Sequence, residues 1–346
     1  EAKKELLEAY KARPSLRDAP VALARIESDA GNYQAALDYL IPVALTGRIS
    51  ADGRALLKTT FQKLHNSSDG LDAMLDAEYE KRYSNPIKIE SYKPTAERSN
   101  RVVLTEIFSS ASCPPCQAAD LSLDAAMKRY ARTDMIVMMY HLHVPRPDPM
   151  TNAATETRGE FYQVEQTPTT LIDGHIVAKG GGGREDAVEF YNDLYPKIDE
   201  RLEAPARAQL RLDATQQGSL IKVHVTVDHI NSPSNVLKLQ IALVEDGLHY
   251  SGESSIRVHP MVVRSLASAE TGGFDVDANE PKTVEYTFDV TKINAELQKY
   301  LEGYEKENGN TFWDRKLPLN VNNLSVVAFV QDTNPKSKQV LQAAFA

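Results

Sequence analysis

The stretch RVVLTEIFSSASCPPCQAAD, residues 101–120, decides how the middle of this chain folds and contains its only two cysteines. Residues 101–108 form a nearly continuous apolar run of strand length, which predicts a strand buried on both of its faces. Cys113 and Cys116 follow with C-x-x-C spacing and two prolines between them. The next residues predict a helix. The sequence thus predicts a buried strand that turns into a helix at a cysteine pair.

The composition argues against several classes of protein. The chain has 346 residues, 42% of them apolar and 25% charged, as in ordinary globular proteins, and this length predicts two or three domains. A net charge of −9 argues against a protein that binds the phosphate backbone of nucleic acid. No apolar run approaches the ~18 residues that would cross a bilayer, so we expect no transmembrane segment. Two cysteines cannot form a disulfide framework for a chain of this size.

Strand and helix patterns alternate through residues 101–205, which we expect to form an α/β domain. TDMIVMMYHLHV (133–144) predicts a second buried strand, and a helix is expected around 152–163. TPTTLIDGHIVAKGG has a two-strand pattern that turns at Asp173. A glycine run (180–183) lacks the G-K-[ST] ending of a phosphate-binding loop and leads into a last, amphipathic helix. The predicted order is strand, helix, strand, helix, hairpin, helix.

The regions on either side have different patterns. Residues 1–85 show apolar residues at helical spacings and no strand-like alternation, which predicts an all-α domain with one helix capped by Ser50. Residues 86–100 are rich in proline, serine and charge and predict a linker. Residues 206–346 consist of alternating or β-branched segments separated by turns, which predicts an all-β sandwich domain.

The order of elements in residues 101–204, with C-x-x-C where the first buried strand becomes a helix, resembles the thioredoxin fold. Thr167-Pro168 before the hairpin resembles the cis-proline loop of that fold. The segment EIFSS before C-x-x-C, together with the later D-P-M segment, resembles secreted bacterial thioredoxin-like proteins of unassigned function. ALVEDGLHY and HPMVVRSL resemble the appended β-domain of outer-membrane-associated relatives. In the N-terminal region, ALARIESDAGNYQAAL resembles one tetratricopeptide unit, with a general helical bundle as the alternative.

The resemblance implies a redox-active pair of cysteines. Only a thiolate is nucleophilic, and the start of a helix stabilises this anion, so Cys113 would be the exposed attacking sulfur. Cys116, one turn inside, would resolve the mixed disulfide. Pro115 suits the first helical turn, and Pro114 stiffens the turn between the cysteines. These prolines would form a substrate-binding ledge together with Thr167 and Pro168, whose cis peptide would set the Thr167 backbone against the sulfurs.

Glu106 lies inside the apolar strand, where a carboxylate is costly unless it is protonated or paired. We therefore expect its pKa to be raised. The resemblance implies that it relays protons to the resolving thiol. It stands seven residues before Cys113, however, where the thioredoxin pattern has its acid at six, so a bulge would be needed to turn it toward the cysteines. A salt-bridged Glu106 at the strand edge is the alternative.

A metal site is the main rival to a redox couple. His141 and His143 alternate on the second predicted strand, so both imidazoles would face the same side. Together with Cys113 and Cys116 they could hold Zn²⁺ or Cu(I), as in thioredoxin-like copper chaperones. The longer cysteine spacing and the distant histidine of those chaperones are missing here. We therefore expect no metal and no cofactor apart from the Cys113–Cys116 couple itself.

The sequence as a whole predicts a three-domain thiol–disulfide oxidoreductase that acts on protein cysteines, with the direction of electron flow left open. Its partners would be protein thiol or disulfide substrates, or a redox partner protein, selected by the flanking domains. The alternative is a binding or adaptor protein built on a thioredoxin-like scaffold. No signal peptide is visible after Glu1, and the resemblance implies export to a bacterial periplasm or cell surface.

Overall fold

The structure is a computed structural model that describes residues 2–13, 17–269 and 272–346. The chain splits into two compact units. Unit 1 contains Glu1–Asn85 and His249–Val258, and unit 2 contains Pro86–Leu248 and His259–Ala346. The region predicted as all-α thus makes up most of unit 1, whereas the regions predicted as α/β and all-β both contribute to unit 2. Within the described ranges, no helix is long and apolar enough to cross a membrane.

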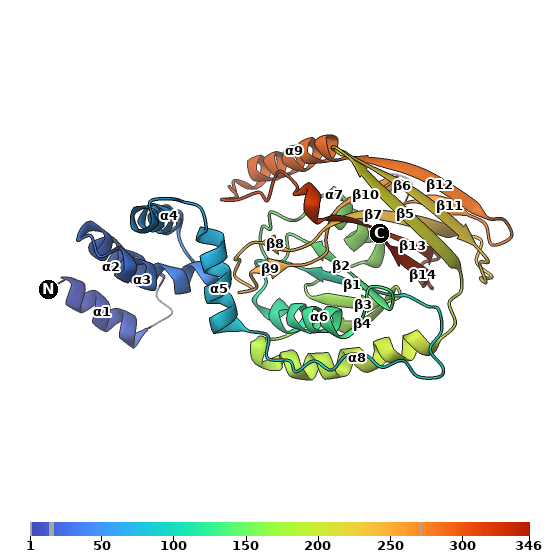
Figure 1. Ribbon diagram of the computed structural model, residues 1–346, viewed down its shortest axis with the longest axis horizontal. Helices are drawn as coiled ribbons and strands as arrows, with labels where there is room; N and C mark the ends of the chain where they lie inside the picture. The colour runs from blue at the N-terminus through green and yellow to red at the C-terminus, as the bar shows by residue number, and fades with distance from the viewer. Residues whose placement is uncertain (1, 14–16, 270–271) are drawn as a thin grey trace. The chain divides into compact units, whose positions relative to one another are not determined.

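Unit 1 is helical, as the spacing of its apolar residues predicts (Figure 1). Its helices are α1 (Ala2–Ala12), α2 (Asp18–Asp29), α3 (Tyr33–Leu45), α4 (Ala51–His65) and α5 (Leu71–Tyr83). Helices α2 to α5 pack around one apolar core that includes Ala24, Leu37, Leu57 and Leu75. The predicted cap is present, because the Ser50 hydroxyl accepts a hydrogen bond of 3.1 Å from a backbone N–H in the first turn of α4.

An excursion of the later chain, His249–Val258, belongs to unit 1. The short strands β8 (Leu248–His249) and β9 (Val258–His259) flank it and pair with each other. Its Arg257 side chain is buried and forms ion pairs with Asp72 at 3.0 Å and Asp76 at 2.6 Å, both on α5. The sequence places this excursion in the C-terminal β region. Local patterns do not reveal which distant helix a loop packs against.

In the described part of unit 2, the main element is a mixed sheet of nine strands, and a separate sheet of three strands accompanies it. The strands of the larger sheet are β1 (Val103–Ser109), β2 (Met135–His141), β3 (Thr169–Ile172), β4 (His175–Lys179), β7 (Leu237–Glu245), β10 (Val262–Leu266), β11 (Phe274–Val276), β13 (Leu324–Asp332) and β14 (Val340–Phe345). Its order is β14-β13-β7-β10-β2-β1-β3-β4, and β11 also pairs with β7. The smaller sheet has the order β12-β6-β5, from β5 (Gln209–Gln217), β6 (Leu220–Asp228) and β12 (Lys282–Asp289).

The order of elements predicted for residues 101–204 is confirmed. Strands β1 and β2 are parallel, β3 is antiparallel to β1, and β3 and β4 form a hairpin. The helices are α6 (Gln117–Arg129), α7 (Ala153–Tyr162) and α8 (Ala187–Glu203), with α9 (Val290–Asn308) in the C-terminal part. Helices α6 and α8 pack together, and the Ser122 hydroxyl donates to the Ala187 carbonyl at 3.1 Å. Tyr162 of α7 packs with the Leu104 and Phe108 side chains of β1.

The C-terminal part is rich in strands, as predicted, but it does not form a sandwich of its own. Strands β7, β10, β13 and β14 extend the sheet that contains β1 to β4 (Figure 1). One face of this extension packs against the three-stranded sheet through residues such as Val225, Leu239 and Ala328. The two layers of a sandwich therefore exist, but the predicted boundary at 205/206 does not separate two sheets. Period-two alternation shows that a strand has one buried face and does not show which strand lies beside it.

Strand β14, at one end of the large sheet, is hydrogen-bonded to the turn of the β3–β4 hairpin. The Val340 N–H of β14 donates to the Asp173 carbonyl at 2.9 Å, and the buried Asp173 carboxylate pairs with Arg101 at 2.7 Å. The predicted turn at Asp173 continues through Gly174, whose φ of +83° is one that L side chains rarely adopt. A Cβ atom there would also overlap the Lys338 carbonyl. This hairpin therefore connects the cysteine-containing part of unit 2 to its C-terminal strands.

Candidate functional site

The two cysteines form a disulfide at the start of α6. Strand β1 ends at Ser109, and a short 3-10 turn, Pro114–Cys116, leads directly into the helix. The Cα atoms of Cys113 and Cys116 lie 5.4 Å apart, and the Cys116 N–H donates to the Cys113 carbonyl at 3.0 Å. The strand, the turn and the helix thus hold the two sulfurs together at the carboxyl end of β1, where the sequence predicts a redox pair.

The Cys113 side chain is buried, which corrects the expectation that its sulfur is exposed. Cys116 is buried as predicted. The Cys113 sulfur lies 3.6 Å from the Thr167 carbonyl oxygen. Backbone bonds of Gly182 hold the glycine run against the turn, with its N–H donating to the Pro115 carbonyl at 2.8 Å and its carbonyl accepting from a helix N–H at 3.1 Å. This cover comes from residues far along the chain, so the C-x-x-C segment itself does not reveal it.

The predicted ledge residues lie beside the cysteines. The Thr167–Pro168 peptide is cis, as predicted, and the Pro168 carbonyl accepts a hydrogen bond of 2.8 Å from the Gly180 N–H. Pro114 is partly exposed and Pro115 is exposed, whereas the two cysteines on either side of them are buried. A Cβ atom at the neighbouring Gly181 would overlap the Pro115 carbonyl and Pro168. Glycine is therefore required where this segment crosses the site.

Glu106 faces away from α6, which argues against the relay role expected for it. The pairing of β1 with β2 runs from Val103 to Ser109 without a bulge, so Glu106 shares the face of Leu104 and Phe108. Its buried carboxylate forms an ion pair with Arg158 of α7 at 2.8 Å. It also accepts hydrogen bonds from the hydroxyl groups of two tyrosines, at 2.9 and 2.7 Å. The salt-bridged alternative describes this residue, although it lies at the centre of the sheet and not at a strand edge.

Asp120 is a buried acid on the cysteine side that the sequence analysis missed. It lies on α6 four residues after Cys116, a separation that places two side chains on the same face of a helix. The Ser109 hydroxyl donates to its two carboxylate oxygens at 2.9 and 3.1 Å. Burial raises the pKa of Asp120 to about 7, although the bond from Ser109 and the nearby His141 oppose the rise. The available signal was the spacing C-x-x-C-x-x-x-D, with two alanines directly before the aspartate.

A second buried acid, Asp148, has surroundings that lower its pKa, unlike those of Asp120. Its carboxylate contacts the His141 Nδ1 atom at 2.9 Å and accepts backbone N–H bonds from Ala111 at 2.6 Å and Met150 at 2.8 Å. Burial alone would raise the pKa of Asp148, but His141 and these N–H groups outweigh it and lower the pKa to about 2. Asp148 therefore stays ionised and attaches the D-P-M segment to the loop that precedes Cys113.

The residues of the metal alternative have other partners. Cys113 and Cys116 are bonded to each other, and His141 is paired with Asp148. The His143 ring stacks on Tyr304 with 3.6 Å between ring centroids, and burial lowers the pKa of His143 to about 4. Across the described ranges, no group of three or more histidine, cysteine or acidic side chains is arranged to hold a metal ion. With the disulfide closed, the four residues of this alternative are therefore not arranged as one set of metal ligands.

The chain matches no protein-family model and no curated protein. Among solved structures it is similar to HBP35 of Porphyromonas gingivalis, with 13% sequence identity and a TM-score of 0.48. The similarity covers 72% of this chain and 75% of that chain.

Proposed function

We propose that this protein is a thiol–disulfide oxidoreductase that acts on protein cysteines through the Cys113–Cys116 couple. The observation that carries the proposal is the disulfide itself, which joins two cysteines at the start of α6 with the Thr167 carbonyl 3.6 Å from one sulfur. Two cysteines bridged within one helical turn need only a small change in the distance between their sulfurs to open and close. A purely structural bridge over so short a loop would add little stability.

We infer that residues 101–205 are a thioredoxin-like centre. Three features support this inference. The strands follow the order β2-β1-β3-β4, with β1 and β2 parallel and the later pairs antiparallel. Helices α6 and α8 pack together, and α7 contributes Tyr162 to the core cluster that contains Leu104 and Phe108 of β1. The cis Thr167–Pro168 peptide lies next to the cysteine turn. The flanking helices and strands would then select the substrate or redox partner.

The proposed exchange proceeds through a mixed disulfide. In the reduced protein, the Cys113 thiolate attacks one sulfur of a substrate disulfide and releases the other substrate sulfur as a thiolate. The Cys116 thiolate then attacks the Cys113 sulfur, forms the intramolecular disulfide and releases the second substrate thiolate, so that the substrate gains two electrons. The reverse sequence oxidises a substrate dithiol. Both directions require Cys113 to become accessible, so the segment over the disulfide must move.

Asp120 replaces Glu106 as the proposed proton acceptor. Cys116 must lose its proton before it attacks, and Asp120 lies one helical turn away from it. A carboxyl group with a pKa of about 7 is divided between its two forms at neutral pH, which is the condition for efficient proton transfer. Glu106 cannot substitute for it from the opposite face of β1.

The proposal is tested by titrating the dithiol against glutathione and by trapping substrate. Cys116→Ser leaves Cys113 able to attack but unable to be released, so a mixed disulfide with substrate should accumulate, whereas Cys113→Ser should trap nothing. The measured potential would give the direction of electron flow. Failure to reduce the disulfide with a large excess of reduced glutathione or dithiothreitol, together with no trapped species, would exclude the proposed activity.

Burial of both sulfurs favours a second candidate, a binding or adaptor protein in which the disulfide is never exchanged. Under this alternative, Cys113→Ser retains the full cellular activity of the protein. Under the proposed function that variant loses it. In either case we propose export to a bacterial periplasm or cell surface, where an intramolecular disulfide can persist.

A further inference from the structure

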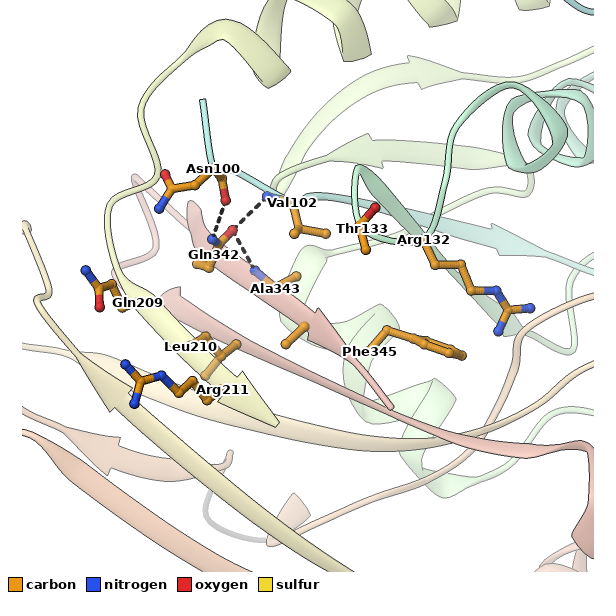
Figure 2. A pocket seen from close by; sticks show the side chains of 11 residues that line it. Asn100, Val102, Arg132, Thr133, Gln209, Leu210, Arg211, Gln342, Ala343 and Phe345 are labelled. Atoms are coloured by element: carbon orange, nitrogen blue, oxygen red, sulfur yellow. Dashed lines mark hydrogen bonds between the residues drawn. The ribbon is translucent and has the colours of Figure 1, made fainter. Parts of the chain in front are cut away.

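A cavity of about 550 Å³ lies at the opposite end of the strands from the cysteines. Figure 2 shows the residues that line it. Val102 immediately precedes β1 and Thr133 lies just before β2, so the cavity borders the amino ends of these two parallel strands. The cysteines follow the carboxyl end of β1. Residues of β5 and β14 complete the lining. Its volume is within the range of about 300–1,000 Å³ that is usual for ligand sites, and it is separate from the redox site.

The lining includes an open strand edge. Val326 of β13 and Ala346 exchange both of their backbone hydrogen bonds, at 2.8 and 3.0 Å. Because such pairs alternate in an antiparallel ladder, the N–H and C=O groups of Phe345 point away from β13. Neither group has a hydrogen-bond partner among the residues that the structure describes. The adjacent part of the edge is closed, since the Gln342 side chain bonds to the Val102 N–H at 2.8 Å and to the Asn100 carbonyl at 3.0 Å.

The cavity has a positive lining in an acidic protein. The chain has a net charge of −9, yet the lining contains two arginines and no acidic side chain. Figure 2 shows the Arg132 and Arg211 guanidinium groups at opposite ends of the lining. Arg211 is exposed and forms no ion pair within the described ranges. Arg132 lies over the Phe345 ring at 4.4 Å and forms an ion pair with Asp246 at 2.7 Å, so Arg211 supplies the uncompensated charge of the lining.

We propose that this cavity binds an extended, acidic peptide segment of a partner protein, which adds a strand to β14 at Phe345. A peptide backbone supplies the donor and the acceptor that the Phe345 carbonyl and N–H groups require together, which a simple anion cannot do. Acidic side chains at the two ends of the segment would pair with Arg132 and Arg211. Apolar side chains between them would pack on Val102 and Leu210, which also line the cavity.

The test uses a defined peptide, glutamate–valine–threonine–valine–glutamate, acetylated and amidated at its ends. It is added to the whole oxidised protein labelled with ¹⁵N-phenylalanine, which has nine labelled sites. We expect a saturable shift of the Phe345 amide signal. Arg211→Glu should weaken binding by about fivefold, which is the effect of losing one of the stronger exposed ion pairs. Lys222→Glu makes the same change of charge on β6, outside the lining, and should leave binding within about twofold.

Two further peptides separate strand addition from general attraction of charge. Replacing both glutamates by lysine should abolish binding, because the arginines would then repel the ends. Methylating the three central backbone nitrogens should also abolish binding, because the peptide can no longer pair with the strand edge. An unshifted Phe345 signal, or equal binding of either altered peptide, would overturn the proposal. A failure here leaves the redox proposal unaffected, since the disulfide is closed throughout.

Discussion

The replacement Asp120→Asn should stabilise the oxidised protein increasingly as the pH rises. Asparagine keeps the size of the side chain and can accept the bond from Ser109, but it has no charge. The carboxyl of Asp120 has a pKa of about 7 in the folded protein, against 3.8 as its ordinary value. The folded state therefore holds a proton that the unfolded state has lost between these two pH values, and the stability of the wild type falls with rising pH in this window.

The magnitude follows from the two pKa values. Each unit of pH within the window changes the free energy of unfolding by about 1.4 kcal/mol. Allowing for the partial titration near pH 7, we expect the advantage of Asp120→Asn over the wild type to grow by about 2.5 kcal/mol between pH 5 and pH 8. The cysteines do not titrate while the disulfide is closed, so they add nothing to the difference.

The assay is urea denaturation at both pH values, followed by the fluorescence of Trp313, the only tryptophan of the chain, which lies in unit 2 with Asp120. Asp124→Asn is the matched control, because it removes the same charge from the same helix at a more exposed site paired with Lys128. Its effect should stay within about 0.5 kcal/mol at either pH.

The same substitution should slow disulfide exchange with glutathione at pH 7 by at least about tenfold. Loss of a general acid–base group typically slows a reaction by about a hundredfold or more, so tenfold is a conservative threshold. An advantage of Asp120→Asn that is the same at pH 5 and pH 8 would refute the reasoning. It would mean that Asp120 titrates near its ordinary value and holds no proton at neutral pH.

Three other substitutions test the surroundings of the site. Arg158→Leu leaves the Glu106 carboxylate buried without its cation and should lower the free energy of unfolding by about 3–5 kcal/mol in urea denaturation, whereas the double variant with Glu106→Gln should recover part of the loss. Gly181→Ala forces a Cβ atom against the Pro115 carbonyl. Overpacking of this kind costs about 1–3 kcal/mol, so reduction of the disulfide by dithiothreitol should become at least tenfold faster. Asp148→Asn should lower the free energy of unfolding by about 2 kcal/mol at pH 6. The pKa of Asp148 is about 2 in the folded protein and ordinarily 3.8, so the ionised carboxylate stabilises the fold above pH 4, and this stabilisation is lost as the pH falls through 2.

Each of these tests has a defined contrary result. Unchanged stability of Arg158→Leu would show that the Glu106 charge is neutralised in another way. Gly303→Ala on α9 is the control for Gly181→Ala, since no atom lies within 4 Å of a Cβ added there. Equal reduction rates in both variants would contradict the idea that the glycine run covers the disulfide. A stability loss for Asp148→Asn that persists unchanged at pH 2 would show that its cause is not the charge.

The elements of the cysteine-containing region could be predicted from the sequence because their signals are local. Continuous apolar runs mark β1 and β2, and C-x-x-C marks the start of α6. An Asp-Gly pair marks the hairpin turn, and a serine marks the start of α4. Each of these depends on a few consecutive residues and on one physical requirement, such as positive φ at Gly174 or an acceptor for a free N–H group.

The partners of those elements could not be predicted in this way. Strands β7 and β13 are buried on both faces, and their apolar sequences fit a separate sandwich as well as an extension of the sheet with β1, because burial does not show which strand lies beside them. The cover over Cys113 comes from Thr167 and the glycine run, more than fifty residues away. Glu106 shows how much depends on register: one residue more or less before the cysteines would have turned it toward α6.

The two buried acids on the cysteine side differ in what their surroundings provide, and this difference decides which can move a proton. Asp148 has two backbone N–H donors and an imidazole, so its charge is compensated and its pKa is low. Asp120 has one serine hydroxyl, so the same degree of burial leaves its charge costly and its pKa high. Donors that stabilise a carboxylate also prevent it from accepting a proton at neutral pH. The proposed proton acceptor for Cys116 is therefore Asp120, the acid with fewer hydrogen-bond donors. The same lack of donors makes its charged form costly in the fold and allows it to accept a proton at neutral pH.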